Sequence, residues 1–397
     1  MFNLTLIGTL GGPNSRAFAI DISRQVAGDS TAAPNGDVHA MFFDGQTQDL
    51  GVLSLPNPFG IPGLPNLDLS SARAIGRLAS GTTLVAGSSS AIVFPAAVVN
   101  RATFWINNVP QDMGTLIPGP AFAGMFLGNS EALGANQQGL IVGVSDIAAL
   151  GTTSVIAQRA FVFNTSIRTM QVLLPTLFPD PAGSGAFFGN SKALGINDHG
   201  QIVGVSDTAD VNPDGSPVRH AFLFDSTTGV MTDLGTLISR MSNPAQTNAN
   251  SEARAINNRG QIVGVSDSLD ANSAPVQRAF LFDPGGFSGR RHMDLGTLNP
   301  ANRPVSFFVD LGNSEANAIN NRGDIVGTAD TGQVDVNGEP IRRGFIFDGT
   351  RPIQDLNATP LPAGWTITEA TGINDNGDIC GFGVDGSGST RGLLLLP

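Results

Sequence analysis

Acidic side chains recur at one position of this chain, directly after a row of hydroxyl residues. The hydroxyl residues are Ser15, Ser70, Ser130, Ser191, Ser251, Ser314 and Thr368. The residues that follow them are Arg16, Ser71, Glu131, Lys192, Glu252, Glu315 and Glu369. If this position faces a common channel, it forms a predominantly acidic ring that also holds Lys192, the only lysine of the chain. Glu131, Lys192, Glu252, Glu315 and Glu369 are therefore candidates for binding a ligand or partner, although a solvated or ion-paired surface is the simpler interpretation.

Paired carboxylates such as Glu131 and Glu252 suggest one kind of catalysis. Two carboxylates can cleave a glycosidic bond as acid and base, but only at separations that a sequence does not provide. The chain has no Gly-x-Ser-x-Gly elbow, no His-Glu-x-x-His metal motif, no phosphate-binding loop and no cysteine–histidine signature. His199 falls in a predicted turn and His220 in a recurrent series, so neither stands out as a general base. The sequence predicts no catalytic residue and favours a non-catalytic protein, while an enzyme stays open.

A possible metal site lies in segment 210–215, which reads Asp-Val-Asn-Pro-Asp-Gly. Oxygen ligands at alternate positions before a glycine are typical of a calcium loop. The twelfth position, where an EF-hand supplies glutamate, is Ala221, so the motif is incomplete. Asp210, Asn212 and Asp214 are candidate calcium ligands, and we expect no other cofactor.

These residues belong to a unit that recurs seven times along the chain. One marker residue of each copy is Asp21, Gly76, Asn136, Asn197, Asn257, Asn320 or Asn374. The clearest copy has short runs rich in Ile, Val, Phe and Leu at 250–257, 261–267, 278–283 and 293–298. Such runs between Gly, Asn and Asp indicate strands, and a period of this length indicates a propeller or a solenoid. The 41% of hydrophobic residues argues for a folded chain despite its 50 Gly and 25 Pro.

The two ends of the chain distinguish a propeller from a solenoid. Residues 3–10 match a fourth strand, whereas 368–374, 378–384 and 391–396 match strands one to three. Together they complete one unit, as a closed ring requires, and neither end has the polar cap of a solenoid. We therefore expect an all-β chain, a single seven-bladed β-propeller domain spanning 1–397. Each blade has four antiparallel strands, and the last is closed by pairing the N-terminal strand (1–10) with the C-terminal hairpin (366–397).

Several recurrent residues have structural interpretations. Hydroxyl and alanine residues two positions apart share one strand face and would suit the crowded centre of a ring. The Asn-x-x-Gly turns that recur after the first strand are explained by turn chemistry. Acidic residues end the second strand and cationic residues open the third, and we expect them to pair across the hairpin. These expected pairs are Asp146 with Arg159, Asp207 with His220, Asp267 with Arg278, and Asp330 with Arg343.

Differences between the units point to one face of the ring. The connections from the fourth strand to the next first strand, and from the second to the third, are long and variable, and in a meander both emerge on the same face. Insertions in repeats often gather on the binding face. The fourth-to-first connections carry Phe122, Phe126, Phe187, Phe188, Phe307 and Phe308. These rings could form an exposed apolar patch for a partner, or each could pack over its own blade.

The units resemble the HAF repeat family, described as probable extracellular repeat proteins. The resemblance rests on Arg/His-Ala-Phe at 159–161, 220–222 and 278–280, on Ile-Asn-x-x-Gly-Gln-Ile-Val-Gly at 256–264, and on Asp-Leu-Gly-Thr-Leu at 233–237. It implies a repeat fold and an extracellular or cell-surface location, and it brings no catalytic residues. Met1 leads straight into the closing strand, which leaves no room for a signal peptide, so a cytoplasmic location stays open.

The charge and composition limit the possible partners. A net charge of −12 disfavours nucleic acid, and no stretch is apolar for long enough to span a membrane. Three functions are left. The first is a binding or assembly module that presents the loop-bearing face to a protein or a glycan. The second is a structural subunit of a surface layer or larger complex, as a homo-oligomer or otherwise. The third is a carbohydrate-active hydrolase or lyase with its site on the same face.

Overall fold

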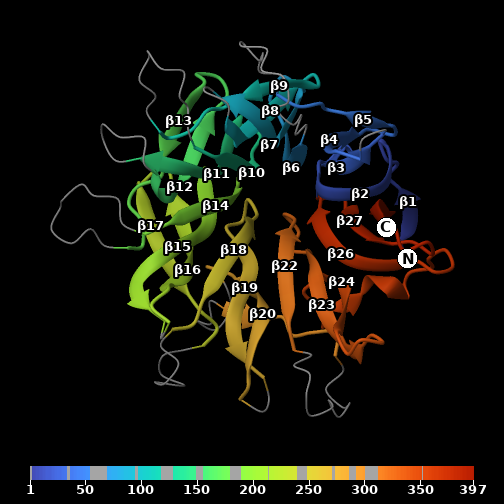
Figure 1. Ribbon diagram of the computed structural model, residues 1–397. Helices are drawn as coiled ribbons and strands as arrows, with labels where there is room; N and C mark the ends of the chain where they lie inside the picture. Colours follow the sequence, from blue (N-terminus) through green and yellow to red (C-terminus); the bar gives the residue numbers. More distant parts are fainter. Residues whose placement is uncertain are drawn as a thin grey trace.

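The computed structural model describes residues 2–33, 36–53, 69–93, 97–117, 128–148, 155–178, 189–212, 214–238, 248–270, 273–285, 292–299, 312–350 and 352–397. These residues form seven four-stranded antiparallel sheets, which surround a common centre as the blades of a propeller (Figure 1). The predicted fold is therefore confirmed.

Each blade is a meander of consecutive strands. Blades 1 and 2 are β2 (Gly11–Ile20), β3 (Val26–Ala32), β4 (Val38–Phe43) and β5 (Thr47–Asp49), then β6 (Ser70–Arg77), β7 (Thr83–Val93), β8 (Ala97–Ile106) and β9 (Val109–Asp112). Blades 3 and 4 are β10 (Ser130–Ala135), β11 (Leu140–Ala148), β12 (Val155–Asn164) and β13 (Thr169–Val172), then β14 (Ser191–Ile196), β15 (Gln201–Val211), β16 (Pro217–Asp225) and β17 (Val230–Gly235). Blades 5 and 6 are β18 (Ser251–Ile256), β19 (Ile262–Leu269), β20 (Pro275–Phe282) and β21 (His292–Asp294), then β22 (Ser314–Ile319), β23 (Ile325–Val334), β24 (Pro340–Phe347) and β25 (Gln354–Asp355).

Blade 7 is built from both ends of the chain. It consists of β26 (Thr366–Ile373), β27 (Ile379–Val384), β28 (Thr390–Leu396) and the N-terminal β1 (Asn3–Leu6). β1 pairs antiparallel with β28, from Asn3 opposite Leu396 to Leu6 opposite Leu393, so that the two ends of the chain lie side by side (Figure 1). The predicted closure is confirmed. Among the described residues, the helical structure is the 3-10 turn η1 (Leu356–Ala358), and no helix is long and apolar enough to cross a membrane.

The hydrophobic core lies between neighbouring blades. At the interface of blades 4 and 5, Val203 and Ala221 pack with Ala253 and Phe280, and all four side chains are almost fully buried. The alanines of the first strand thus face the preceding blade and do not line the centre of the ring. Small residues are required there because the third-strand phenylalanines fill the same space.

Buried serines connect the blades by hydrogen bonds. Ser251 of blade 5 accepts from the Ala221 N–H at 2.9 Å and donates to the Gly235 carbonyl at 2.5 Å, both in blade 4. Ser266 accepts from the Leu237 N–H at 2.9 Å. Loss of such a partner leaves a buried backbone group unsatisfied, at a cost of about 1–3 kcal/mol. The six serines of the hydroxyl row are therefore explained by contacts between blades. The exception is Thr368, whose hydroxyl donates to the Phe382 carbonyl of its own blade at 3.2 Å.

Asparagines link the turns that join the first and second strands of neighbouring blades. Asn257 accepts from the N–H groups of Arg259 and Gln261 in its own turn, and it donates through Nδ2 to the Asn320 carbonyl at 2.9 Å. The same link runs from Asn136 through Asn197, Asn257, Asn320 and Asn374 to the carbonyl of Asp21. These turns surround a cavity of about 260 Å³. The turn-chemistry interpretation is confirmed, and the same side chains also hold adjacent blades together.

Candidate functional site

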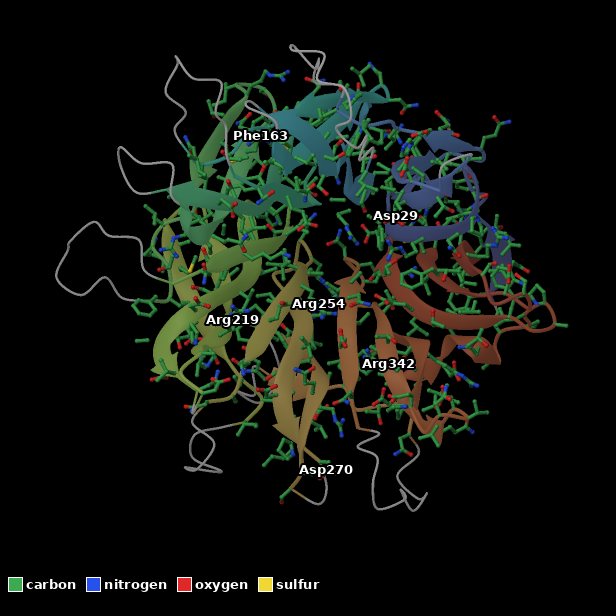
Figure 2. The ribbon with its side chains drawn as sticks, in the orientation of Figure 1. Asp29, Phe163, Arg219, Arg254, Asp270 and Arg342 are labelled. Atoms are coloured by element: carbon green, nitrogen blue, oxygen red, sulfur yellow. The ribbon has the colours of Figure 1, made fainter. Side chains whose placement is uncertain are left out.

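A β-bulge in the innermost strand of each blade directs one residue toward the channel. In blade 5, Ala253 pairs with Gly264 and Ala255 with Val263, so Arg254 has no partner in the ladder. The equivalent bulged residues are Phe18, Arg73, Leu133, Leu194, Arg254, Asn317 and Thr371. Bulges re-aim side chains and are enriched beside functional sites. In Figure 2, Arg254 lies near the centre of the ring.

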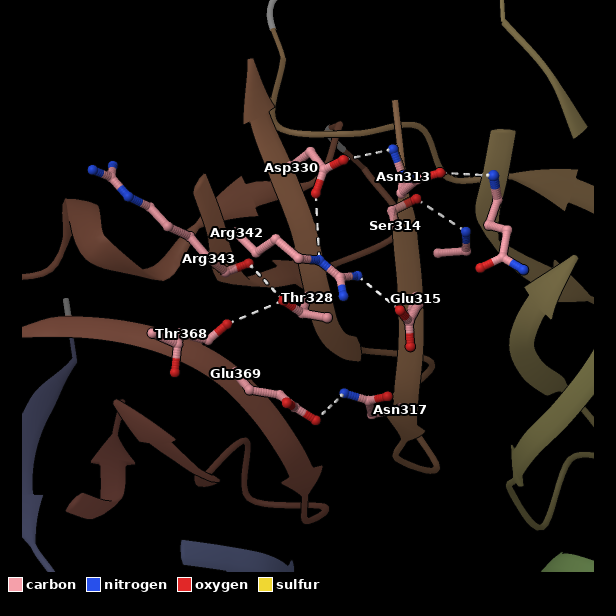
Figure 3. Close-up of polar contacts among 12 residues, drawn as sticks. Asn313, Ser314, Glu315, Asn317, Thr328, Asp330, Arg342, Arg343, Thr368 and Glu369 are labelled. Atoms are coloured by element: carbon pink, nitrogen blue, oxygen red, sulfur yellow. Dashed lines mark hydrogen bonds and ion pairs between the residues drawn. The ribbon is translucent and has the colours of Figure 1, made fainter. Parts of the chain in front are cut away.

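The acidic residues of blades 5, 6 and 7 meet at this bulged row. Arg254 Nε lies 3.0 Å from Glu252 Oε1, and Arg254 Nη1 lies 2.7 Å from Glu315 Oε2. Arg342 donates to the other oxygen of Glu315 at 2.8 Å. Asn317 accepts from Arg254 at 2.7 Å. Asn317 also donates to Glu369 Oε1 at 3.3 Å (Figure 3). We call these six residues, Glu252, Arg254, Glu315, Asn317, Arg342 and Glu369, the channel network.

The channel network shifts the pKa values of two of its carboxylates in opposite directions. Burial alone would raise the pKa of Glu315, but the charges and hydrogen bonds of Arg254 and Arg342 outweigh it and lower that pKa. Burial, and after it the charge of Glu315, raises the pKa of Glu369. Burial would lower the pKa of Arg254, which Glu315 and Glu252 nevertheless raise. Glu315 is thus held as an anion, whereas Glu369 binds a proton more readily than an ordinary glutamate does.

The rest of the channel wall is more basic and carries an aromatic ring. Arg73 lies over the ring of Phe18, 4.2 Å from its centroid, and Arg16 lies 5.4 Å from the same centroid. Arg16 also forms an ion pair with Asp29 at 2.9 Å. On blades 3 and 4, Lys192 lies 3.8 Å from Glu131. The predicted site residues therefore form two groups, one around Glu315 and one at Lys192 with Glu131.

Two grooves extend from the channel between blades. The first, which we call the blade 4–5 groove, has a volume of about 510 Å³ and is lined by Asn212, Arg219, Glu252, Arg254, Asp267 and Glu315, among others. The second, of about 580 Å³, lies between blades 3 and 4 and includes Lys192, Arg219 and Glu252. Both open on the face that carries the second-to-third hairpins. This face is the one on which the sequence predicted a functional surface.

The predicted charge pairs are wrong by one residue. Across the hairpin of blade 4, Asp207 lies opposite Arg219, with Arg219 Nε 3.0 Å from Asp207 Oδ1, and His220 lies opposite Ser206. His220 instead contacts Asp233 of the fourth strand at 2.8 Å. Neighbouring residues of a strand point to opposite faces, so a shift of one residue changes the partner completely. The other expected pairs shift in the same way, because Asp146, Asp267 and Asp330 lie opposite Gln158, Gln277 and Arg342.

The candidate calcium loop forms the tip of the β15–β16 hairpin. Asp214 accepts from the N–H and the hydroxyl of Ser216 at 2.9 and 2.6 Å. These bonds, with that of the hydroxyl first, lower the pKa of Asp214. Asn212 donates to the Ser216 hydroxyl at 3.1 Å. Turn chemistry accounts for these contacts, and no group of three or more His, Cys, Asp or Glu in the described ranges is placed to hold a metal. Calcium binding at Asp210, Asn212 and Asp214 stays a prediction.

The residues predicted from the sequence and the residues of this site differ in two ways. The predicted phenylalanines, Phe122, Phe126, Phe187, Phe188, Phe307 and Phe308, lie outside the described residues. Sequence reasoning missed Arg254, Asn317 and Phe18, which stand two positions after the variable acidic position. The period of two along a strand was the signal that could have found them, because it places both positions on one face.

Comparisons with known proteins found one family model that matches part of the chain and several propellers of similar fold. Residues 130–289 match a family model described as a protein of unknown function, DUF3466. A comparison with curated proteins found no match. The resemblance to HAF repeat proteins stays a prediction.

Several solved structures resemble the chain over most of its length. The β-propeller domain of the Trilobed protease from Pyrococcus furiosus is 10% identical, with a TM-score of 0.48 over 98% of this chain and 94% of that one. A protein of unknown function from Dyadobacter fermentans is 10% identical, with a TM-score of 0.38 over 99% and 97%. A Trypanosoma rangeli sialidase is 9% identical, with a TM-score of 0.38 over 97% of this chain and 54% of the sialidase. At these values we draw no functional conclusion from the likeness.

Proposed function

We propose that this propeller is a non-catalytic binding module that holds a glycan chain in the blade 4–5 groove and against the channel network. The observation that carries the proposal is that the blade 4–5 groove and the channel network share residues. Glu252, Arg254 and Glu315 belong to the channel network and also line the groove. A chain-like ligand in the groove would therefore reach the centre of the ring.

The lining of the groove favours a glycan over a protein partner. Its side chains are mainly carboxylates, guanidinium groups, amides and hydroxyls, with only small apolar patches from Val205, Pro217 and Val265. Protein interfaces depend on buried aromatic and other large anchors. A sugar hydroxyl both donates and accepts, and so pairs with each of these polar groups. The lining has three carboxylates, of Glu252, Asp267 and Glu315, against the two guanidinium groups of Arg219 and Arg254, which favours a neutral glycan over an acidic one. An extracellular location, as the HAF resemblance implies, would bring this face into contact with secreted polysaccharides.

The proposal predicts that neutral polysaccharides bind and that Glu252→Gln weakens them. We expect at least one of laminarin, xyloglucan and dextran to slow migration of the protein in affinity gels, and alginate and polygalacturonate to have less effect. Glu252→Gln removes a charged acceptor from the groove and should raise the dissociation constant about tenfold, the equivalent of about 1.4 kcal/mol, as measured by titration calorimetry.

The matched control is Glu131→Gln, which changes the equivalent position of blade 3 away from this groove. It should leave the affinity unchanged. If none of the neutral polysaccharides binds, or if both substitutions weaken binding equally, the proposed site is wrong.

A specific observation also favours a second function, a carbohydrate-active hydrolase or lyase. Glu369 has a raised pKa and Glu315 a lowered one, and the side chain of Asn317 hydrogen-bonds Glu369 while Arg254 bonds both Asn317 and Glu315. Carboxylates whose environments shift their pKa values apart are typical of acid–base pairs. In this function Glu369 would donate a proton to the leaving group.

This second function predicts a strong effect of Glu369→Gln. Release of reducing ends from a bound polysaccharide should fall at least about 100-fold, because a general acid contributes on that order. A proton donor must be protonated, so activity should be lost as the pH rises through the raised pKa of Glu369. Glu131→Gln should retain full activity. A polysaccharide that binds tightly and is not cleaved at any pH at which the protein stays folded argues against this function.

A further inference from the structure

Four aspartates occupy equivalent places at the end of the second strand. Each accepts through Oδ2 from the backbone N–H of an asparagine at the start of the first strand of its own blade. The pairs are Asn129 with Asp146 (2.8 Å), Asn190 with Asp207 (2.7 Å), Asn250 with Asp267 (2.7 Å) and Asn313 with Asp330 (3.0 Å). All four asparagines also accept through Oδ1 from a backbone N–H in the third strand of the preceding blade, at Asn100, Gln158, Arg219 and Gln277. Each carboxylate is therefore held in one orientation by contacts that link the blades.

The second oxygen of these carboxylates distinguishes blade 5 from its neighbours. Gln158 Nε2 donates to Asp146 Oδ1 at 3.0 Å, and Arg219 Nε donates to Asp207 Oδ1 at 3.0 Å. Arg342 Nε lies 3.3 Å from Asp330 Oδ1 as an ion pair (Figure 3). In blade 5, no hydrogen bond or ion pair from any described residue reaches Oδ1 of Asp267.

The lack of a described partner for Asp267 Oδ1 is not explained by the type of the residue opposite it. Gln277 lies directly opposite Asp267 in the ladder, just as Gln158 lies opposite Asp146. Gln158 closes its pair, whereas the exposed side chain of Gln277 makes no hydrogen bond to a described residue. Asp146, Asp207 and Asp330 are buried, but Asp267 is only half-buried. Blade 3 thus contains a closed copy of the same pair of residue types.

The open pair lies between two cavities. Asp267 and Gln277 both line the blade 4–5 groove, and both line a further cavity of about 530 Å³ that includes Asn248 and Asn313. A rigidly held carboxylate and an amide that bonds no described residue therefore lie side by side, about one strand spacing apart, where a ligand in the groove passes them.

We infer that Asp267 and Gln277 form the contact that selects a free hydroxyl group at one position of the bound glycan. The inference rests on the proposed function. The carboxylate can only accept, so the ligand atom that meets Oδ1 must carry a hydrogen. The amide of Gln277 donates to the same oxygen of the ligand. A hydroxyl satisfies both groups at once, whereas an ether or a missing oxygen leaves a carboxylate oxygen unsatisfied in the groove.

The test compares matched substitutions in blades 5 and 3, with laminarin, xyloglucan and dextran as probes. Gln277→Leu keeps the size of the side chain. It should weaken, by about tenfold, the binding of whichever of these polysaccharides the parent protein binds, as the loss of one hydrogen bond does. Asp267→Asn should have an effect of the same order. Gln158→Leu and Asp146→Asn make the same changes in the closed pair of blade 3. They should change the affinity by no more than about twofold, because substitutions away from a site have small effects.

A second readout follows the contact directly. In spectra of the ¹⁵N-labelled protein, the side-chain amide signal that disappears in Gln277→Leu should shift when the polysaccharide is added. The signal that disappears in Gln158→Leu should not. Binding that is equal in all four variants, with no shift at Gln277, overturns this contact and leaves the proposed function standing. If no neutral polysaccharide binds the parent protein, the proposed function fails and this contact fails with it.

Discussion

Deleting residues 2–10, with Met1 kept as the initiator, is expected to lower the free energy of unfolding by about 5 kcal/mol, because burial of each large aliphatic side chain contributes about 1.5–3 kcal/mol. Ile7 is 2% exposed, and Phe2 and Leu4 pack against the cluster that contains Leu393 and Leu395. The deletion also exposes the edge of β28, which pairs with β1 from Leu393 to Leu396. Urea denaturation monitored by tryptophan fluorescence measures the change, and Trp365, next to β26 in the closing blade, reports on it directly.

A circular permutant separates the role of strand pairing from that of chain connectivity. Because Asn3 lies opposite Leu396, an Asn-Gly turn can join Pro397 to Phe2 and move residues 2–10 to the end of the chain. This permutant restores the pairing of β1 with β28 but cuts the covalent link from blade 7 to blade 1. We expect it to be more stable than the deletion and less stable than the parent. An unchanged urea midpoint in the deletion variant would show that β1 does not hold the ring closed.

Replacing Gly264 by alanine is expected to destabilise the protein by about 3 kcal/mol, at the upper end of the usual cost of overpacking. A Cβ at this position would lie 1.9 Å from the carbonyl oxygen of Glu252, and therefore against backbone that no side-chain rotation can relieve. The close approach occurs beside the bulge at Arg254. Gly264 thus permits the backbone geometry that brings Arg254 into the channel.

The control for this substitution is Gly285→Ala. Its Cβ would meet Asp283 Oδ1 at 3.6 Å, an ordinary contact, so the change in stability should stay within about 0.5 kcal/mol. The urea midpoints of the two variants are compared under the same conditions. Similar midpoints for both variants would mean that the backbone at Gly264 relaxes without cost, and the link between the glycine and the bulge would be wrong.

The repeat unit made the fold and its closure predictable, because the hydrophobic pattern and the split unit at the ends both follow from strand pairing. For Glu252, Glu315 and Glu369 the sequence left two interpretations open, a channel or an ion-paired surface, and in the structure Arg254 and Asn317 connect these three side chains. It missed Arg254 and misassigned the partner of Asp207. The period of two along the strand could have found Arg254, because it places Arg254 on the same face as Glu252. The partner of Asp207 depends instead on the register of the hairpin, and a shift of one residue in that register leaves no mark in the hydrophobic pattern.

The bulged residues of the first strands can vary in type without a change in the strand pairing that forms the ring. A bulged residue lies outside the hydrogen-bonded register, so its side chain can be exchanged without loss of a ladder bond. The present occupants already range from leucine to phenylalanine, threonine, asparagine and arginine on nearly the same backbone. The channel is therefore a natural starting point for redesign, in which a new binding specificity is engineered from these positions alone while the scaffold stays untouched.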